Sequence, residues 1–329
     1  MKKQVTLTVL ALATAMTATT AQADDIKISG KVFTDYGNQS STTAGTTTDT
    51  QGANITRTYL TAKKKIDDTW SAKVTFDSAV NKGHTGKDNE VFLKTAQLTG
   101  KFSNELNVKV GLIGTPWIGY EDGLGKHRHV SKSYVDTHGM DSSADAGIGV
   151  FGKALDGMLS YDVVSINGGG YGATGRTDTT DTNIRVGVAP VKGLTIDLGQ
   201  HAGYFGKTKA TGDKTTLTQT MVTYGNEVDD LSYRVAVNLI SNKKDTAGTT
   251  DKATEFWIWA RKGDLGAYLR NESTNWDGKA TDEKRTVVSL DYYAAKGVIL
   301  SLVSDKSTGV KGVDGDEKSS TGIFTQFAF

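Results

Sequence analysis

The sequence contains no cysteine in its 329 residues, so no disulfide bond contributes to its stability. It has only two prolines. Beyond its first two dozen residues it has no run of about 18 apolar residues that could form a membrane-spanning helix. Glycine is abundant, with 38 residues, and so are threonine and serine. This composition excludes a helical membrane protein and a disulfide-stapled domain, and it favours a β-protein with many turns.

Charges of the two signs nearly balance. The chain carries 38 lysines and arginines against 37 aspartates and glutamates. Without residues 1–23, which include Lys2 and Lys3, the chain has 36 basic and 37 acidic side chains. A balanced chain is not suited to bind nucleic acid or an anionic membrane surface through its net charge. We therefore expect no nucleic-acid partner.

The N-terminus has the three parts of a secretory signal. Met1-Lys2-Lys3 is basic, residues 5–18 form a short apolar segment, and Ala21-Gln22-Ala23 matches the small-residue pattern of a cleavage site. The alternative is a buried first helix of a cytosolic domain, but strand-like sequence begins at Ile26. We predict a cleaved signal peptide over residues 1–23 and one domain over residues 24–329.

The rest of the chain alternates apolar and polar residues with a period of two. In residues 231–239 the odd positions are Leu, Tyr, Val, Val and Leu, and the even positions are Ser, Arg, Ala and Asn. This period is that of a β-strand with one apolar and one polar face. We find sixteen such segments, near residues 26–37, 54–66, 69–79, 90–102, 105–113, 146–154, 158–167, 182–190, 194–205, 216–228, 231–241, 252–262, 264–274, 284–294, 297–304 and 319–329.

The links between these segments alternate between short and long. Short links such as Asp67-Asp68 contain turn-forming residues, and long ones such as residues 40–51, 168–181 and 243–250 are polar. Tight turns at one end and longer loops at the other are typical of outer-membrane barrels. The polar face carries charges too hydrated for a dry core, so we interpret it as a wet interior. The sequence predicts an all-β, transmembrane, antiparallel up-and-down barrel of about sixteen strands around an aqueous channel.

Aromatic residues are expected to mark the two membrane interfaces, because tyrosine and tryptophan concentrate there. The set consists of Tyr36, Tyr59, Trp70, Tyr224, Tyr233, Trp257, Trp259, Tyr292 and Tyr293.

The C-terminal residues 323–329 read Ile-Phe-Thr-Gln-Phe-Ala-Phe. This segment resembles the closing strand of Gram-negative outer-membrane proteins, in which the terminal phenylalanine is part of an assembly signal. Phe329 and Phe327 match it. Together with the signal peptide and the sixteen segments, the chain resembles the trimeric, sixteen-stranded general diffusion porins. The resemblance implies a homotrimer in the lipid of the Gram-negative outer membrane, inserted by the barrel-assembly machinery, that passes small hydrophilic solutes and ions.

In that family the long third loop folds into the barrel, and its acidic residues face a basic wall. The matching connection here is residues 114–145, the longest in the chain. Glu121 and Asp122 match the acidic side of such a constriction. The segment lacks the Pro-Glu-Phe-Gly-Gly type of sequence found in enterobacterial porins and adds Lys126 and Arg128 as further constriction candidates. An external loop packed on the rim is the alternative for this segment.

Basic residues outnumber acidic ones on the predicted inner faces. The candidates for a basic wall are Arg57, Lys63, Lys73, Lys109, Arg185, Arg234, Arg270 and Arg285, with Lys27 and Lys31 beside them and Asp35, Asp77, Asp162, Asp197, Glu272 and Asp291 against them. A field of this sign concentrates small anions in a narrow tube. We expect passive diffusion with a weak anion preference. The alternatives are a substrate-selective channel of the anion or phosphate type and a plugged structural or adhesive barrel.

Enzymatic chemistry has little support in the sequence. It contains no Gly-x-Ser-x-Gly elbow and no serine, histidine and aspartate set that can be placed together. His127, His129 and His138, with Glu121 and Asp136, are a conceivable metal site, but they lack the spacing of ligands on a rigid element. We expect no catalysis, no metal and no cofactor.

Overall fold

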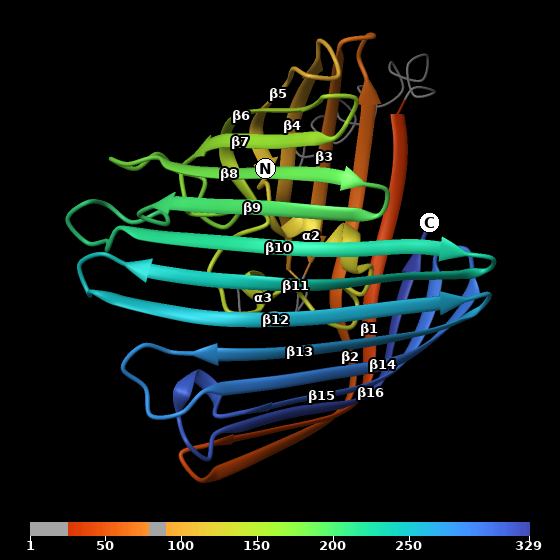
Figure 1. Ribbon diagram of the computed structural model, residues 1–329, viewed down its shortest axis with the longest axis vertical. Coiled ribbons are helices and arrows are strands. Elements are labelled where there is room, and N and C mark those ends of the chain that lie inside the picture. Colours follow the sequence, from red (N-terminus) through yellow and green to blue (C-terminus); the bar gives the residue numbers. More distant parts are fainter. Residues whose placement is uncertain (1–25, 79–89) are drawn as a thin grey trace, which may run out of the picture.

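The computed structural model describes residues 26–78 and 90–329. Sixteen antiparallel strands form one closed barrel (Figure 1), in which each strand pairs with its neighbours in sequence and β1 pairs with β16. The strands are β1 (Ile26–Thr43), β2 (Thr46–Lys65), β3 (Trp70–Ser78), β4 (Val91–Lys101), β5 (Asn107–Gly114), β6 (Ala144–Ala154), β7 (Leu159–Ile166), β8 (Asp181–Val191), β9 (Leu194–Gly203), β10 (Thr215–Val228), β11 (Leu231–Lys244), β12 (Thr249–Lys262), β13 (Leu265–Asn275), β14 (Glu283–Ala295), β15 (Val298–Thr308) and β16 (Glu317–Ala328). The predicted fold class is confirmed. The predicted signal peptide at residues 1–23 lies outside the described residues.

The helical elements are short. Helices α2 (Ile118–Gly125) and α3 (Tyr134–Thr137) lie between β5 and β6, and the 3₁₀ turn η2 (Val310–Gly312) precedes β16. In the described part of the chain, no helix is both long enough and apolar enough to cross a bilayer.

Alternation of side chains divides each strand into two faces. On the outer face Leu60, Leu198, Leu239 and Leu302 leave about half of their surface or more exposed, whereas inner-face residues such as Asp77 and Asp197 are buried. A barrel in water would show the reverse arrangement. Closure also pairs the backbone groups of every strand, which a chain in hydrocarbon requires. The strand faces therefore suit lipid outside and a polar lumen inside.

The two ends of the barrel differ. The end that carries Ile26 and Phe329 has short links, such as those at residues 192–193 and 229–230, and we call it the turn end. The opposite end, the loop end, carries the connections at residues 115–143, 167–180, 204–214 and 309–316.

One predicted long loop is wrong. Residues 40–51 continue the hairpin of β1 and β2, which reverses at Ala44 and Gly45. Threonine favours extended backbone, and the hydroxyl oxygens of Thr42 and Thr47 lie 2.9 Å apart across the hairpin. The link predicted at residues 243–250 is likewise shortened by the ends of β11 and β12. Polar strands can therefore extend beyond the band of exposed apolar side chains that surrounds the outside of the barrel.

Four of the predicted interface aromatics lie elsewhere. Tyr59, Trp259 and Tyr293 line the inner cavity, and Trp257 is buried on the inner face of β12. For Trp257 and Trp259 the reason is that the segment between β5 and β6 fills part of the lumen and turns the facing wall into an apolar core. This core includes Trp117, Ile118, Tyr134, Leu217, Met221 and Trp257.

The C-terminus closes the barrel against β1. Phe329 exchanges two backbone hydrogen bonds with Gly30, at 2.8 and 3.0 Å. A Cβ atom at position 30 would lie 2.1 Å from Cζ of Phe329, so the ring occupies the space that Gly30 leaves. Phe327 is 42% exposed on the outer face.

We expect Gly30→Val to destabilise the barrel by about 1–3 kcal/mol, because the added side chain displaces the Phe329 ring from its seat. The measurement is the urea midpoint of unfolding of the detergent-purified protein. Gly175→Ala is the matched control, since a Cβ atom at position 175 meets no atom within 4 Å. Equal midpoints for the two variants would contradict the assigned packing.

Candidate functional site: the lumen and the segment that narrows it

Residues 114–145, which we call the inner segment, pack against the inner faces of strands on one side of the barrel. The Trp117 indole lies over Gly199 of β9, where a Cβ atom would be 2.4 Å from Cε3 of the indole. Ile118, Tyr134 and Val135 are fully buried. The absence of a side chain at Gly199 thus makes room for the entry of the segment into the lumen, and apolar burial holds it there.

Polar anchors fix the inner segment along the same wall. They join Tyr120 to Asp197 of β9, Leu124 O to Trp259 Nε1 of β12, Tyr134 to Thr274 of β13, His127 to Asp291 of β14 and His129 to Ser301 of β15, each at 2.8 Å. Burial lowers the pKa of His129 to about 3, so this side chain is neutral at physiological pH. Anchors on five strands make the segment a fixed element.

Glu121 lies on the wall side of the inner segment. Its carboxyl group accepts a hydrogen bond from the Trp117 indole at 2.8 Å and lies beside Glu255. Arg270 pairs with both Glu255 and Glu272. Burial, followed by the charge of Glu255, raises the pKa of Glu121 well above its usual range. The structure therefore places this sequence candidate in the anchor, where it presents no charge to the lumen.

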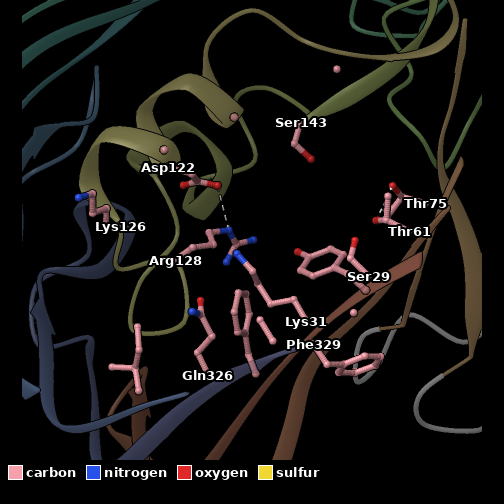
Figure 2. A pocket seen from close by; sticks show the side chains of 18 of the residues that line it. Ser29, Lys31, Thr61, Thr75, Asp122, Lys126, Arg128, Ser143, Gln326 and Phe329 are labelled. Carbon is pink, nitrogen blue, oxygen red and sulfur yellow. Dashed lines mark hydrogen bonds and ion pairs between the residues drawn. The ribbon is translucent and has the colours of Figure 1, made fainter. Parts of the chain in front are cut away.

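Asp122 and Arg128 lie on the opposite, water-facing side of the inner segment (Figure 2). The Arg128 guanidinium lies 3.2 Å from Asp122 and 3.0 Å from Asp136, and both carboxylates belong to the same segment. Burial raises the pKa of Asp122 to about 6 despite the opposing effect of Arg128. Lys126 places its ammonium group 4.4 Å from the centre of the Trp259 ring. The water-facing side of the segment thus carries charges of both signs.

The raised pKa of Asp122 predicts pH-dependent ion selection. Above about pH 6 the carboxylate is charged and offsets Arg128, and below it the carboxyl group is neutral. The preference for anions over cations should therefore increase as pH falls from about 7.5 to about 5. Reversal potentials across a planar bilayer, measured at both pH values, report this change.

The control for this prediction is Asp122→Asn, which has no charge to lose. Its anion preference at pH 7.5 should already resemble that of the wild type at pH 5. If the anion preference changes equally between the two pH values in the variant and the wild type, the titrating group is not Asp122.

The wall residues predicted from sequence lie on the inner face, but most have a partner. Carboxylates neutralise five of them: Arg57 pairs with Asp77, Lys109 with Asp162, Arg185 with Asp197, Arg270 with Glu255 and Glu272, and Arg285 with Glu272 and Asp305. Arg234 donates to the Thr223 hydroxyl. Guanidinium groups that are committed to carboxylates add little net charge to the lumen.

The lysines at the turn end differ from these paired cations. Lys27 faces Lys63 across β1 and β2, and Lys63 faces Lys73 across β2 and β3. In residues 26–78 and 90–329 none of these three lysines forms an ion pair. Like charges at facing positions of adjacent strands destabilise a sheet. This row of three lysines is therefore a local excess of positive charge.

Lys94 is a lumen residue that sequence reasoning missed. It is the extra residue of a β-bulge, because Thr75 faces Thr95 and Phe76 faces Leu93. The bulge shifts the alternation of faces and turns Lys94 inward, where it lies 3.2 Å from Asp77. Simple alternation along β4 places it on the outer face. The neighbouring sequence carries no signal for the bulge.

Two cavities lie along the lumen, one toward each end. The cavity toward the turn end has a volume of about 1190 Å³, and the one toward the loop end about 850 Å³. Asp136 of the inner segment lines both, so the passage narrows at this segment. Six basic and four acidic side chains line the larger cavity: Lys31, Lys73, Lys94, Lys126, Arg128 and Arg261 against Asp122, Asp136, Glu227 and Asp230. The lining thus has a positive balance.

The histidines of the inner segment serve as wall contacts. His127 stacks on Tyr268 with ring centres 4.4 Å apart, besides its hydrogen bond to Asp291. His138 lies over Tyr134 and 3.7 Å from Glu272. Among the described residues, no group of three potential ligands has the geometry of a metal site.

Comparisons with known proteins agree with this architecture. The family model described as phosphate-selective porin O and P matches residues 26–122. An anion-selective porin from Comamonas acidovorans has a TM-score of 0.64 at 12% identity, over 92% of this chain and 99% of the other. OmpF of Salmonella typhi has a TM-score of 0.61 at 11% identity, over 92% and 97%. The trimer form of OmpT of Vibrio cholerae has a TM-score of 0.55 at 13% identity, over 92% and 99%. No curated protein matches significantly.

These matches are to channel-forming porins and not to enzymes, as expected from the sequence. At such low identity the structural matches establish the fold, and the family model covers less than half of the chain. The chain has the fold of the Gram-negative outer-membrane porins, a closed sixteen-stranded antiparallel barrel.

Proposed function

We propose that the protein is an outer-membrane channel through which small anions diffuse in preference to cations. The observation that carries this proposal is the row formed by Lys27, Lys63 and Lys73, which lies on the inner face without a carboxylate partner in the part of the chain that the structure describes. Repulsion between like charges on adjacent strands lowers the stability of the sheet. The same charges attract anions and raise their concentration in a narrow, low-dielectric passage. Basic side chains also outnumber acidic ones in the lining of the larger cavity, which favours the same preference for anions.

Two further cations, Lys94 and Arg128, lie beside the path toward the loop end, each in contact with a carboxylate. Both line the turn-end cavity, at the level where the inner segment narrows it. The loop-end cavity is lined by Lys132, Arg285, Lys311 and Lys318 against Asp136, Glu283 and Asp305. An anion that crosses the barrel thus meets basic side chains at both ends and at the narrowing. We assign the size limit to residues 114–145 and the charge preference to the unpaired lysines.

A selective channel for phosphate-type anions is the finer candidate. The family model for phosphate-selective porins matches residues 26–122, and this stretch contains the lysine row, Arg57, Lys94 and Asp122. The commitment of Arg57 and Arg128 to carboxylates weakens their capacity for bidentate phosphate binding. We therefore regard phosphate as one of several anions that the path accepts.

The location and assembly follow from the same proposal. We place the loop end toward the exterior and the turn end toward the periplasm, because outer-membrane barrels have long external loops and short periplasmic turns. A homotrimer is proposed by analogy with porins, one of which is described as a trimer form. Insertion by the barrel-assembly machinery would use the Phe329 terminus.

Single cysteines test the path directly, because the natural chain has none. We expect Lys73→Cys and Lys94→Cys to lower the anion preference in a planar bilayer. A cationic methanethiosulfonate reagent should restore it, and an anionic one should lower it further. Lys252→Cys, on the outer face of β12, is the matched control and should respond to neither reagent. Identical behaviour of Lys73→Cys and this control would refute the assigned path.

Phosphate titration separates the finer candidate from the general one. At constant potassium chloride, a selective phosphate site predicts that the chloride current falls and saturates as phosphate is added. In a channel with a general anion preference, the current should change only as the mobilities and concentrations of the added ions require, without saturation. Acetate at the same concentrations is the control anion.

A further inference from the structure

The loop between β7 and β8, residues 167–180, reaches the wall of β4. The ring of Tyr171 stacks on Phe92 of β4 with ring centres 5.4 Å apart and an angle of 7° between their planes. Strands β5 and β6 lie between β4 and β7 in the barrel, so the loop spans the width of two strands to make this contact. Tyr171 is therefore an addition to the lumen wall that comes from outside the inner segment.

The start of this loop is fixed by hydrogen bonds. The backbone N–H of Gly170 donates to Asp145 at 2.9 Å, and the Asn167 side-chain amide donates to the carbonyl groups of Thr174 and Gly175. Gly170 has a φ of +69°, and a Cβ atom there would lie 2.6 Å from Oγ of Ser142. Only glycine fits this position without strain. The loop thus holds Tyr171 in a defined place.

Tyr171 contacts the two cations of the adjoining wall. The Lys94 ammonium group lies 4.6 Å from the centre of the Tyr171 ring and 5.3 Å from that of Tyr59. The Tyr171 hydroxyl is within hydrogen-bonding reach of the Arg57 guanidinium. Asp77 draws both cations from one side, at 2.6 Å to Arg57 and 3.2 Å to Lys94. The two rings and Asp77 together fix the Lys94 ammonium group beside the cavity.

We propose that Tyr171 is the positioning residue that keeps Lys94 on the solute path and narrows the passage along the β2–β4 wall. This inference rests on the proposed anion channel. The faces of aromatic rings attract cations, so removal of the Tyr171 ring leaves the ammonium group, which already lies 3.2 Å from Asp77, paired more fully with this carboxylate. The passage then becomes wider and less positive at this level. The loop of residues 167–180 is in this sense a second narrowing element beside the inner segment.

The test compares Tyr171→Ala, Tyr171→Phe and wild type in planar bilayers. We expect Tyr171→Ala to raise the single-channel conductance about 1.5-fold and to lower the anion-to-cation permeability ratio about twofold. Tyr171→Phe keeps the ring and should remain close to wild type in both. Tyr204→Ala, in the next loop and without contact to Lys94, is the matched control.

A double-mutant cycle separates positioning from a merely structural role. In a Lys94→Gln background, Tyr171→Ala should no longer change the permeability ratio, because the cation that it positions is gone. An undiminished effect in that background, or wild-type behaviour of Tyr171→Ala, would overturn the inference. A wild-type channel without anion preference would instead refute the proposed function, and the conductance of Tyr171→Ala would still test the narrowing.

Discussion

Replacement of Lys63 and Lys73 by glutamate is expected to convert the channel from anion preference to cation preference. The two lysines face each other on β2 and β3 with no carboxylate partner among the described residues. Reversal of both charges changes the local charge by four elementary charges at the turn end of the lumen, where Lys73 lines the cavity. We expect the anion-to-cation permeability ratio to fall about tenfold, with a change in the sign of the reversal potential in a salt gradient.

Lys64→Glu is the matched control for this reversal. Lys64 lies between Lys63 and Lys65 on β2, but its side chain belongs to the outer face. Its replacement should leave the reversal potential unchanged, since the field of an outer-face charge does not act along the passage. If the control shifts the potential as much as Lys63→Glu, net charge and not position sets the preference.

Replacement of Arg270 by methionine is expected to cause the largest loss of stability. Arg270 is 2% exposed and pairs with Glu255 and Glu272 beneath the inner segment. Without it, Glu255 stays buried without its cation, and Glu272 keeps its 3.3 Å contact with Arg285. Breaking a buried pair from one side costs about 3–5 kcal/mol. The urea midpoint of unfolding should fall accordingly, and the inner segment should become accessible to protease.

Two further variants distinguish a specific network from general sensitivity at this wall. Lys262→Met removes an exposed cation, whose pair with Asp230 leaves the two side chains 71% and 60% exposed, and it should change the midpoint far less. Arg270→Met combined with Glu255→Gln and Glu272→Gln removes the uncompensated charges and should recover part of the loss. A midpoint for Arg270→Met equal to that of Lys262→Met would contradict the role of the network.

The sequence predicts the barrel well because every strand separates lipid on one side from water on the other. Each strand must place apolar residues on one face and polar residues on the other, and this leaves a period of two in all sixteen segments. The predicted faces of Arg57, Lys73, Arg185 and Arg285 follow from this period. Strand length was harder to predict, because the polar hairpin of β1 and β2 extends past the apolar belt.

The site was less predictable, because its charges pair between strands and loops that are distant in sequence. Arg57 meets Asp77, and Glu121 meets Glu255, only through strand register and the path of the inner segment. The inward turn of Lys94 depends on a bulge that alternation does not encode. One signal was present, since Phe256-Trp257-Ile258-Trp259 is apolar on both faces. Such a stretch indicates a wall covered from inside as well as outside.

The most direct test of the account is the reversal potential of the wild-type channel. The mature chain is refolded in detergent, inserted into a planar bilayer and measured in a tenfold gradient of potassium chloride. The account predicts stepwise openings and a reversal potential that favours chloride. A potential that favours potassium would contradict the assigned role of the lysine row, and folded, inserted protein without conductance would contradict the channel itself.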